Sequence, residues 1–259
     1  MKVALFTPWP PQRSGIAVYA YRLAKGLLEQ NVELEVFTAA TSPKPLEGCA
    51  IHKVTADSGS LLAGDAFPVF QLGNDVSFHA FQPCALARLG GLVHLHDPVL
   101  HHFHMDRTLA TGAGGYWDDL EFWYGPAVAN ACNRLIDLGA PPWSNAAVTA
   151  IPLFEPYLQF ADAVVVHSQS ALRAIKQRMP TLRGYCLPRS YPMERDFAAA
   201  MGRYVGILAE LAGKRSRRRI IEDALYRDAA VALADLELAG TPGEEAIAAE
   251  ILGTLGPCF

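Results

Sequence analysis

The residues with the most evident chemical potential form a histidine-rich segment in the first half of the chain. The stretch from Gly91 to His104 holds five of the eight histidines. It begins with a short apolar run, Leu92 to Leu95, which is typical of a strand buried on both faces. His96 and Asp97 follow this run directly, and open α/β sheets bind ligands beside the carboxyl ends of their strands. The pattern therefore predicts a site that begins at His96.

Three chemistries compete for these histidines. Imidazole and carboxylate groups suit zinc and related ions, but strand alternation places His94 and His96 on one face and leaves the later histidines to a turn or helix. Because this is no defined ligand set, we assign no metal site. A structural interpretation has His94, His102 and His104 packing beneath a helical segment. In the third, which we adopt, His96 and Asp97 project into a cleft and form hydrogen bonds with a sugar.

Polar residues also follow other apolar runs. Gly15 opens a helical pattern, and a glycine there lets a phosphate or sugar approach backbone N–H groups at the positive end of the helix dipole. Ser14 before it is equally suited to be an ordinary N-cap. Asn74 follows another strand, where its amide could bond with a ligand hydroxyl; the alternative is an ordinary Asn/Asp turn and helix cap. His167 and Ser168 follow a run of valines, where Ser168 also suits an N-cap.

Short apolar runs predict the strands that would position these residues. They lie at Val3 to Thr7, Leu34 to Thr38, Pro68 to Leu72, Leu92 to Leu95 and Ala163 to Val166. Helical patterns separate them, as from Gly15 onward. This alternation predicts an α/β protein with a single Rossmann-like, doubly wound parallel sheet.

Two regions depart from the alternation. Around residues 106–143, aromatic residues stand among glycines and acids without a strand pattern, and we expect a helical insertion there. Residues 193–259 are helical in composition, with Met201, Tyr204 and Leu208 on one face. We therefore expect a Rossmann-like domain over residues 1–192 and a helical tail over residues 193–259 that packs back on it.

Composition limits the classes of partner and compartment. The formal net charge is −4, so bulk electrostatics give no reason to expect a nucleic-acid partner. The five cysteines are widely spaced and form no CxxC pair, which suits reduced thiols. We see neither a signal peptide nor a membrane-spanning run, and we therefore expect a soluble, cytoplasmic protein.

The order of these motifs resembles a family of retaining glycosyltransferases with the GT-B fold, family 4 type. The resemblance covers about Met1 to Pro188 and rests on the segments PPQRSGIAVY, QLGN with a later histidine, VHLHDPVLHH and ADAVVVHS. It implies that Gly15 approaches the donor phosphates and that His96 lies near the transferred sugar. It also implies that Asn74, His167 and Ser168 line the same cleft.

The resemblance also predicts a missing part. In that family a second Rossmann-like domain, which binds the nucleotide sugar, follows the first. Here the segment after Pro188 leads directly into a helix resembling the one that crosses back to the first domain in two-domain relatives, at Phe197 to Tyr204. The residues that remain are too few for a typical domain. We expect an internal deletion of the donor domain between Pro188 and Phe197.

These implications lead to two functional hypotheses. In the first, the chain is the acceptor-side half of a retaining, nucleotide-sugar-dependent glycosyltransferase (hexosyltransferase type) and is inactive alone. It would use a UDP- or GDP-sugar only with a separate donor-binding subunit, bind no cofactor tightly, and act on a sugar or lipid-linked acceptor. In the second, it is a non-catalytic acceptor-binding or protein-interaction module.

Association is expected under either hypothesis. The exposed cleft face would pair with a donor-domain subunit or form a homodimer. The basic run from Lys214 to Arg219 is interpreted as a solvated linker, with contact to a membrane surface as the alternative.

Overall fold

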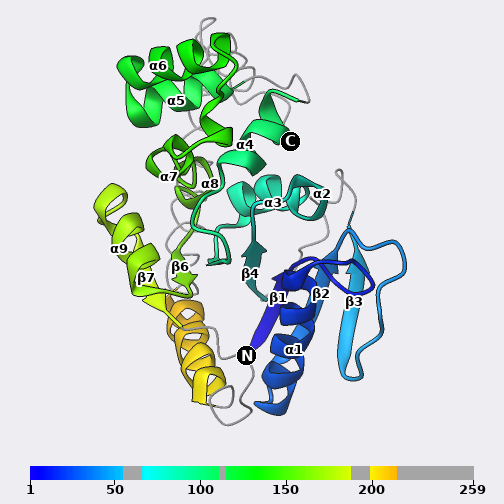
Figure 1. The fold of residues 1–259 in the computed structure, drawn as a ribbon. Coiled ribbons are helices and arrows are strands. Elements are labelled where there is room, and N and C mark those ends of the chain that lie inside the picture. Colours follow the sequence, from blue (N-terminus) through cyan, green and yellow to red (C-terminus); the bar gives the residue numbers. More distant parts are fainter. Residues whose placement is uncertain (55–65, 111–114, 188–198, 215–259) are drawn as a thin grey trace, which may run out of the picture. The chain divides into compact units, whose positions relative to one another are not determined.

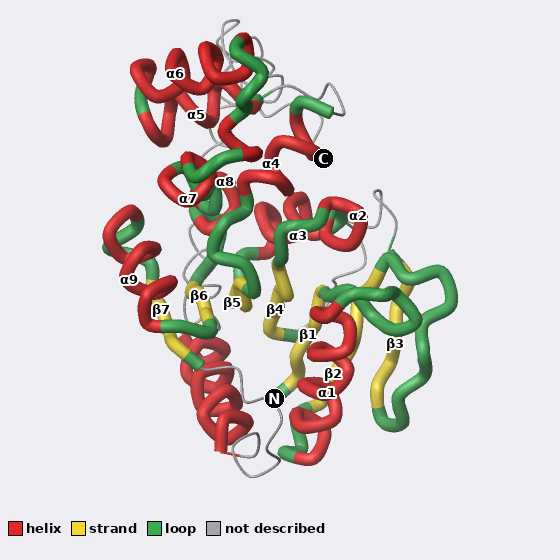
Figure 2. The backbone as a smooth tube through the Cα atoms, in the orientation of Figure 1, coloured by secondary structure: helices red, strands yellow, loops and turns green. Residues whose placement is uncertain are grey.

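The computed structural model describes residues 1–54, 66–110, 115–187 and 199–214. Residues 1–208 form one compact unit and residues 209–259 a second. The first unit is built on a seven-stranded sheet in which every paired neighbour is parallel, with helices flanking it (Figures 1 and 2). The predicted fold class, α/β with a Rossmann-like, doubly wound parallel sheet, is confirmed.

The strands follow the apolar runs of the sequence. The sheet has the order β3-β2-β1-β4-β5-β6-β7. Side chains of the central strands are buried on both faces, which is why these strands are continuously apolar. The strands are β1 (Lys2–Phe6), β2 (Glu33–Thr38), β3 (Cys49–Lys53), β4 (Phe67–Leu72), β5 (Leu92–Leu95), β6 (Ala163–Val166) and β7 (Arg183–Cys186).

The strand order reverses direction beside β1. From β1 the chain adds β2 and β3 on one side, then crosses to the other side and adds β4 to β7 in sequence. The loops that follow β1 and β4 therefore leave the sheet in opposite directions. Such a switch point opens a crevice at the carboxyl ends of the two strands, where ligands of doubly wound folds bind.

Helix α1 (Gly15–Glu29) is positioned by a cap and an apolar stripe. Ser14 is its N-cap, and the Ser14 Oγ accepts a hydrogen bond from the Ile16 N–H at 3.2 Å. Ala17, Ala20 and Leu23 are among the buried residues of the stripe that faces the sheet. The packing of this stripe fixes the N-terminus of α1 at the end of β1 (Figure 1).

Other helices lie between the later strands and after them. Between β4 and β5 lie α2 (Val76–His79) and α3 (Gln82–Leu89), and α9 (Gln169–Arg178) connects β6 to β7. Residues 199–214 are also helical, and Met201, Tyr204 and Leu208 within the first unit are buried, as the helical pattern predicts.

A helical segment separates β5 from β6 and is longer than the insertion predicted at about residues 106–143. The helical segment begins at His101, within the histidine-rich stretch, and continues to Leu158. Further helices after residue 143 account for the greater length. Helices α5 and α6 pack side by side (Figure 1) around a small core of their own that includes Tyr116, Leu120 and Cys132. The helical segment between β5 and β6 consists of α4 (His101–Thr108), α5 (Tyr116–Tyr124), α6 (Pro126–Asp137), η2 (Pro142–Ser144), α7 (Ala147–Ala150) and α8 (Glu155–Leu158).

Other sequence-based expectations fall partly or wholly outside the described residues. These are the predicted deletion between Pro188 and Phe197 and nearly all of the basic run that starts at Lys214. In the described part of the chain, each helix is too short or too polar to cross a bilayer. The four cysteines described there are free thiols.

Candidate functional site

A cavity of about 810 Å³ opens at the switch point of the sheet. Its lining residues come from the loops that follow β1, β4 and β5, together with the first turns of α1 and the short helix α2. The volume lies within the range of roughly 300–1,000 Å³ that is usual for ligand pockets. The cavity therefore has the size and the position of a small-molecule site.

The first wall of the cavity is the N-terminus of α1. Arg13, Ser14 and Gly15 all line it. The Ser14 hydroxyl is used as the helix cap, so the structural interpretation of this residue holds. Gly15 is exposed, and apart from its chain neighbours and the backbone of its own helix, no atom lies within 4 Å of the position that a Cβ would take there. The free space above Gly15, the helix dipole and the Arg13 guanidinium together favour an anionic group such as a phosphate.

The second wall follows β4 and includes Asn74. Asn74 Oδ1 accepts a hydrogen bond from the Phe103 N–H at 3.0 Å, and its Nδ2 lies 3.3 Å from His102 Nδ1. Its side-chain amide therefore provides a hydrogen-bond acceptor for a backbone N–H in the first turn of α4. Asn74 stands at the predicted place in the cavity, but its amide makes contacts within the protein.

The third wall is formed by His96 and Asp97 after β5. The Asp97 Oδ2 atom accepts a hydrogen bond from the Asn74 backbone N–H at 3.1 Å. This bond links the loops after β4 and β5 and orients the half-buried carboxylate toward the cavity. A carboxylate has two oxygens and about four acceptor positions, so Asp97 retains acceptor capacity for ligand hydroxyl groups.

His79 also lines the cavity, although the sequence interpretation did not include it in the site. Its side chain is buried and its Nδ1 lies 3.1 Å from Gln82 Nε2. Burial lowers the pKa of His79 to about 4, against smaller opposing effects of Asp75 and the Gln71 backbone. His79 is therefore neutral at pH 7.

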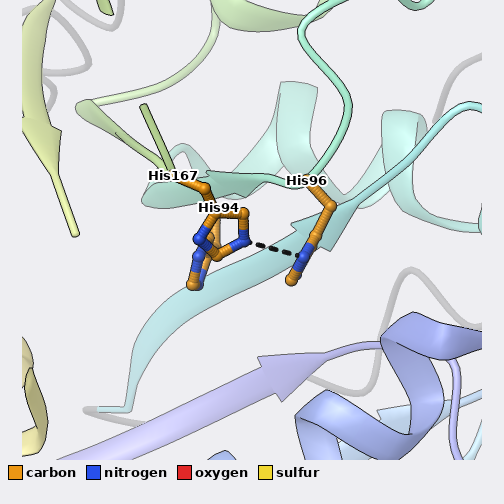
Figure 3. Close-up of side chains that lie close together, drawn as sticks. All are labelled: His94, His96 and His167. Carbon is orange, nitrogen blue, oxygen red and sulfur yellow. Dashed lines mark hydrogen bonds between the residues drawn. The ribbon is translucent and has the colours of Figure 1, made fainter. Parts of the chain in front are cut away.

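His96 joins the cavity to a cluster of three histidines. His94, on β5, and His96, directly after it, point to the same face, as strand alternation predicts, and their rings stack with centroids 4.6 Å apart. His167, directly after β6, lies beside them: its Nε2 is 3.1 Å from His96 Nδ1. Figure 3 shows the three side chains gathered at the strand ends. The centroid of the Tyr19 ring, on α1, lies 4.9 Å from that of the His96 ring.

Both ring nitrogens of His96 have protein partners. Nδ1 faces His167, and Nε2 forms a hydrogen bond with Gln71 Oε1, on the neighbouring strand β4. The side chain is almost fully buried. His96 thus borders the cavity mainly as a fixed ring, and a ligand hydroxyl would have to replace one of these partners to bond with it.

The later histidines and Ser168 have structural contacts instead. His101 bonds through Nδ1 with the Ile151 carbonyl at 2.7 Å, and His104 Nδ1 lies 2.9 Å from the Tyr157 hydroxyl. Both therefore anchor the helical segment, which the structural interpretation expected for His104. Ser168 caps α9, and its Oγ accepts a hydrogen bond from the Ala171 N–H at 3.2 Å. It does not belong to the cavity lining.

Some site residues carried a signal that the sequence interpretation did not use. Arg13, directly before Ser14, and Tyr19, one helical turn after Gly15, both stand within the motif PPQRSGIAVY, but neither was assigned to the site. His79 is the later histidine of the QLGN motif but was assigned no role, and its place in the cavity depends on how α2 packs.

Comparisons with known proteins do not add to this assignment. No protein-family model matches the chain, and no curated protein matches its sequence significantly. The functional assignment therefore rests on the residues of the cavity and on the motifs that place them there.

Proposed function

We propose that this chain is the acceptor-side half of a retaining, nucleotide-sugar-dependent glycosyltransferase that needs a separate donor-binding partner for transfer. One observation carries the proposal: a single cavity gathers Ser14, Gly15, Asn74, His96 and Asp97. The order of motifs along the sequence selected these five residues as site residues, together with His167 and Ser168, which do not line the cavity. The five residues come from three separate segments of the chain, which meet at the switch point of the sheet.

The chemistry of the walls suits a sugar linked to a phosphate. The N-terminus of α1, with Gly15 and Arg13, offers a positive potential and space for an anionic group. The Asp97 carboxylate would accept hydrogen bonds from sugar hydroxyls, and the Tyr19 ring offers an apolar face. Under this proposal His96 and its neighbours hold the wall rigid near the reaction centre.

The partner would supply what this half lacks. Retaining transfer requires a positioned acceptor and stabilisation of the departing nucleoside diphosphate, and electrostatic stabilisation is usually the larger contribution. Arg13 and α1 would provide only part of it. We therefore propose a UDP- or GDP-sugar donor that binds between this chain and a donor-domain subunit. The acceptor would be a sugar or lipid-linked sugar, and the complex would work in the cytoplasm.

Binding by the chain alone gives the first test. A Cβ at Gly15 would meet no protein atom within 4 Å, so Gly15→Ala preserves the fold and places a methyl group in the cavity. We expect a weak interaction of the wild type with UDP- and GDP-sugars or free sugars, measured by ligand-observed NMR. Gly15→Ala should weaken it about tenfold or more, in the range of pocket methyl effects. Equal binding by both proteins would place the ligand elsewhere.

Transfer with a partner gives the second test. The chain is co-expressed with candidate donor-domain proteins, and radiolabelled transfer from UDP- and GDP-sugars is measured together with the anomeric configuration of the product. We expect retained configuration, no transfer by the chain alone, and strong loss in Asp97→Asn. Inverted products, or no transfer with any donor-domain partner, would contradict the proposal.

A second candidate function is a non-catalytic acceptor-binding or protein-interaction module. It is favoured by the engagement of the His96 nitrogens and the Asn74 amide within the protein. Sugar binding that is sensitive to Gly15→Ala, without transfer in any complex, would support this alternative over the enzyme.

A further inference from the structure

We infer that His94, His96 and His167 form a binding site for one divalent transition-metal ion, with Zn²⁺ as the ion that best fits. The inference is independent of sugar binding and of glycosyl transfer. In the described residues, these three histidines offer ligand nitrogens that all lie within 4.8 Å of one another. In one known type of zinc site, three histidines bind the ion and a water molecule takes the fourth position.

The parallel sheet explains why the three side chains meet. His94 lies on β5 and His96 directly after it; because they are two residues apart in extended backbone, they share a face. In the register between β5 and β6, His94 is paired with Val165, and continuing this register places His96 beside His167. Two adjacent strands thereby present three imidazoles at their carboxyl ends (Figure 3). From the sequence, the candidates to join His94 and His96 were Asp97 and the later histidines, whereas the structure supplies the third histidine from the next strand.

The outer nitrogens of two rings are fixed as hydrogen-bond donors. His96 Nε2 bonds with Gln71 Oε1, and His167 Nδ1 lies 3.1 Å from the Leu187 carbonyl oxygen. Both oxygens can only accept, so both ring nitrogens carry the proton. Histidines that bind metals usually donate their other N–H to such an acceptor, which fixes the tautomer.

The inner nitrogens of the same rings then face each other with lone pairs. His96 Nδ1 and His167 Nε2 are 3.1 Å apart. Two lone pairs at this distance repel unless a cation lies between or beside them. Zinc–nitrogen bonds of about 2.0–2.1 Å in a tetrahedral site separate two ligand nitrogens by about 3.4 Å. The observed separation is close to this value.

His94 completes the set after a small movement. The ligand atoms all lie within 4.8 Å of one another, so the widest pair would shorten by at most about 1.4 Å to reach the tetrahedral value. The His94 and His96 rings now stack at 14°, so at least one must turn until both ring planes contain the ion. The contact between Gln71 Nε2 and His94 Nδ1 is long for a hydrogen bond, at 3.4 Å, so this contact opposes a rotation of the His94 ring only weakly.

A buried hydroxyl beside the cluster gives independent support. The Tyr204 ring lies 5.5 Å from that of His94, and its hydroxyl has no hydrogen-bond partner among the described residues. Burying a hydroxyl without a partner costs free energy. Water on a metal ion at the cluster would offer this hydroxyl a partner.

The test is a metal titration of tag-free protein after removal of bound metal with a chelator. Co²⁺ is added first, because it occupies zinc sites and its visible absorption reports coordination number. We expect binding of one equivalent, an intense tetrahedral spectrum, and displacement by one equivalent of Zn²⁺. Binding of no ion, or only of several weakly held octahedral ions, would overturn the inference.

Variants assign the ion to the cluster. His94→Gln, His96→Gln and His167→Gln should each weaken cobalt binding at least tenfold, and Gln71→Met about 10- to 100-fold as an outer-shell change. His52→Gln is the matched control, because His52 lies on the edge strand β3 and should leave affinity unchanged. Circular dichroism verifies that each variant is folded. Unchanged affinity in all three cluster variants would overturn the assignment.

The wild-type protein offers a measurement that does not depend on folded variants. In ¹⁵N-labelled protein, Zn²⁺ should shift ring nitrogen resonances of three histidines and leave that of His52 in place. The competing explanation is a proton shared between His96 and His167. Ring resonances that respond to pH but not to zinc would favour this proton and overturn the metal site.

Discussion

At the scale of single residues, His79 links the cavity to the stability of the fold. Its side chain is 1% exposed, and burial lowers its pKa from 6.5 to about 4. The folded state therefore favours neutral imidazole, whereas the unfolded chain takes up a proton near pH 6.5. The resulting stability is fully present above pH 6.5 and is lost as pH falls toward 4. It amounts to on the order of 3 kcal/mol.

Urea unfolding at pH 7.5, 5.5 and 4.5 tests this residue directly. The free energy of unfolding should fall with pH in the wild type and fall less in His79→Gln, which cannot take up the proton. Other buried histidines contribute equally to both proteins, so the difference between the two curves isolates His79. A constant difference across this pH range would contradict the assignment.

Gly73 and Gly15 have opposite surroundings. A Cβ at Gly73 would lie 2.4 Å from Ile16 Cδ1 and 3.1 Å from Asp97 Oδ2, whereas one at Gly15 would meet nothing within 4 Å. Gly73→Ala should therefore lower the free energy of unfolding by about 1–3 kcal/mol, as overpacking does. Gly15→Ala should leave it unchanged or raise it, because alanine favours the helix. Thermal unfolding of both variants measures the contrast, and equal effects would refute it.

The two glycines also mark what the sequence can disclose about the site. Gly15 was predictable because it opens a helix after an apolar run. The crowding at Gly73 depends on α1 meeting the loop after β4, which no local pattern records. His96 and Asp97 were found from their place after a strand, but the partnership of His96 with His167 arises from strand register, 71 residues along the chain.

At the scale of elements, burial decides which strands the sequence reveals. Each of the five predicted runs coincides with a strand to within one residue at either end. The two edge strands were not predicted: β3 and β7 have partly exposed side chains such as Lys53 and Arg183 and lack a continuous apolar run. An edge strand has only one neighbour, and its side chains need not be apolar.

One buried carboxylate holds three helices together. Glu155, on α8, is fully buried and accepts hydrogen bonds from Arg178 Nε on α9 and from the Tyr124 hydroxyl on α5, the latter at 2.7 Å. The Arg178 guanidinium also lies 4.0 Å from the centroid of the Tyr124 ring. The network joins the helical segment to the helix that follows β6.

The two ends of this ion pair should respond unequally to substitution. Arg178→Met keeps the aliphatic stem but leaves a buried charge uncompensated, which costs about 3–5 kcal/mol. Glu155→Gln should cost less, because the Arg178 side chain is 31% exposed and water can reach it. Urea unfolding of both single variants and the double variant measures the difference. Equal losses, or a larger loss in Glu155→Gln, would contradict this reading of the network.

At the scale of the whole molecule, the proposed function requires the cavity face to meet another chain. Val18, on α1, lines the cavity with 50% of its surface exposed. An apolar residue at the rim of such a site is suited to an interface. Phe122, on α5, is 75% exposed but does not belong to the cavity lining. The two residues therefore distinguish the cavity face from the helical segment as the contact surface.

Sedimentation over a wide range of concentration, with and without a donor-domain partner, tests this requirement. Val18→Glu should weaken self-association or complex formation at least tenfold, because the carboxylate would have to lose its water inside the contact. Phe122→Glu should leave association unchanged, and neither exposed substitution should alter thermal stability. If Phe122→Glu alone disrupts association, the contact lies on the helical segment. A monomer at every concentration and with every partner would leave the cavity open to solvent and contradict the two-chain enzyme.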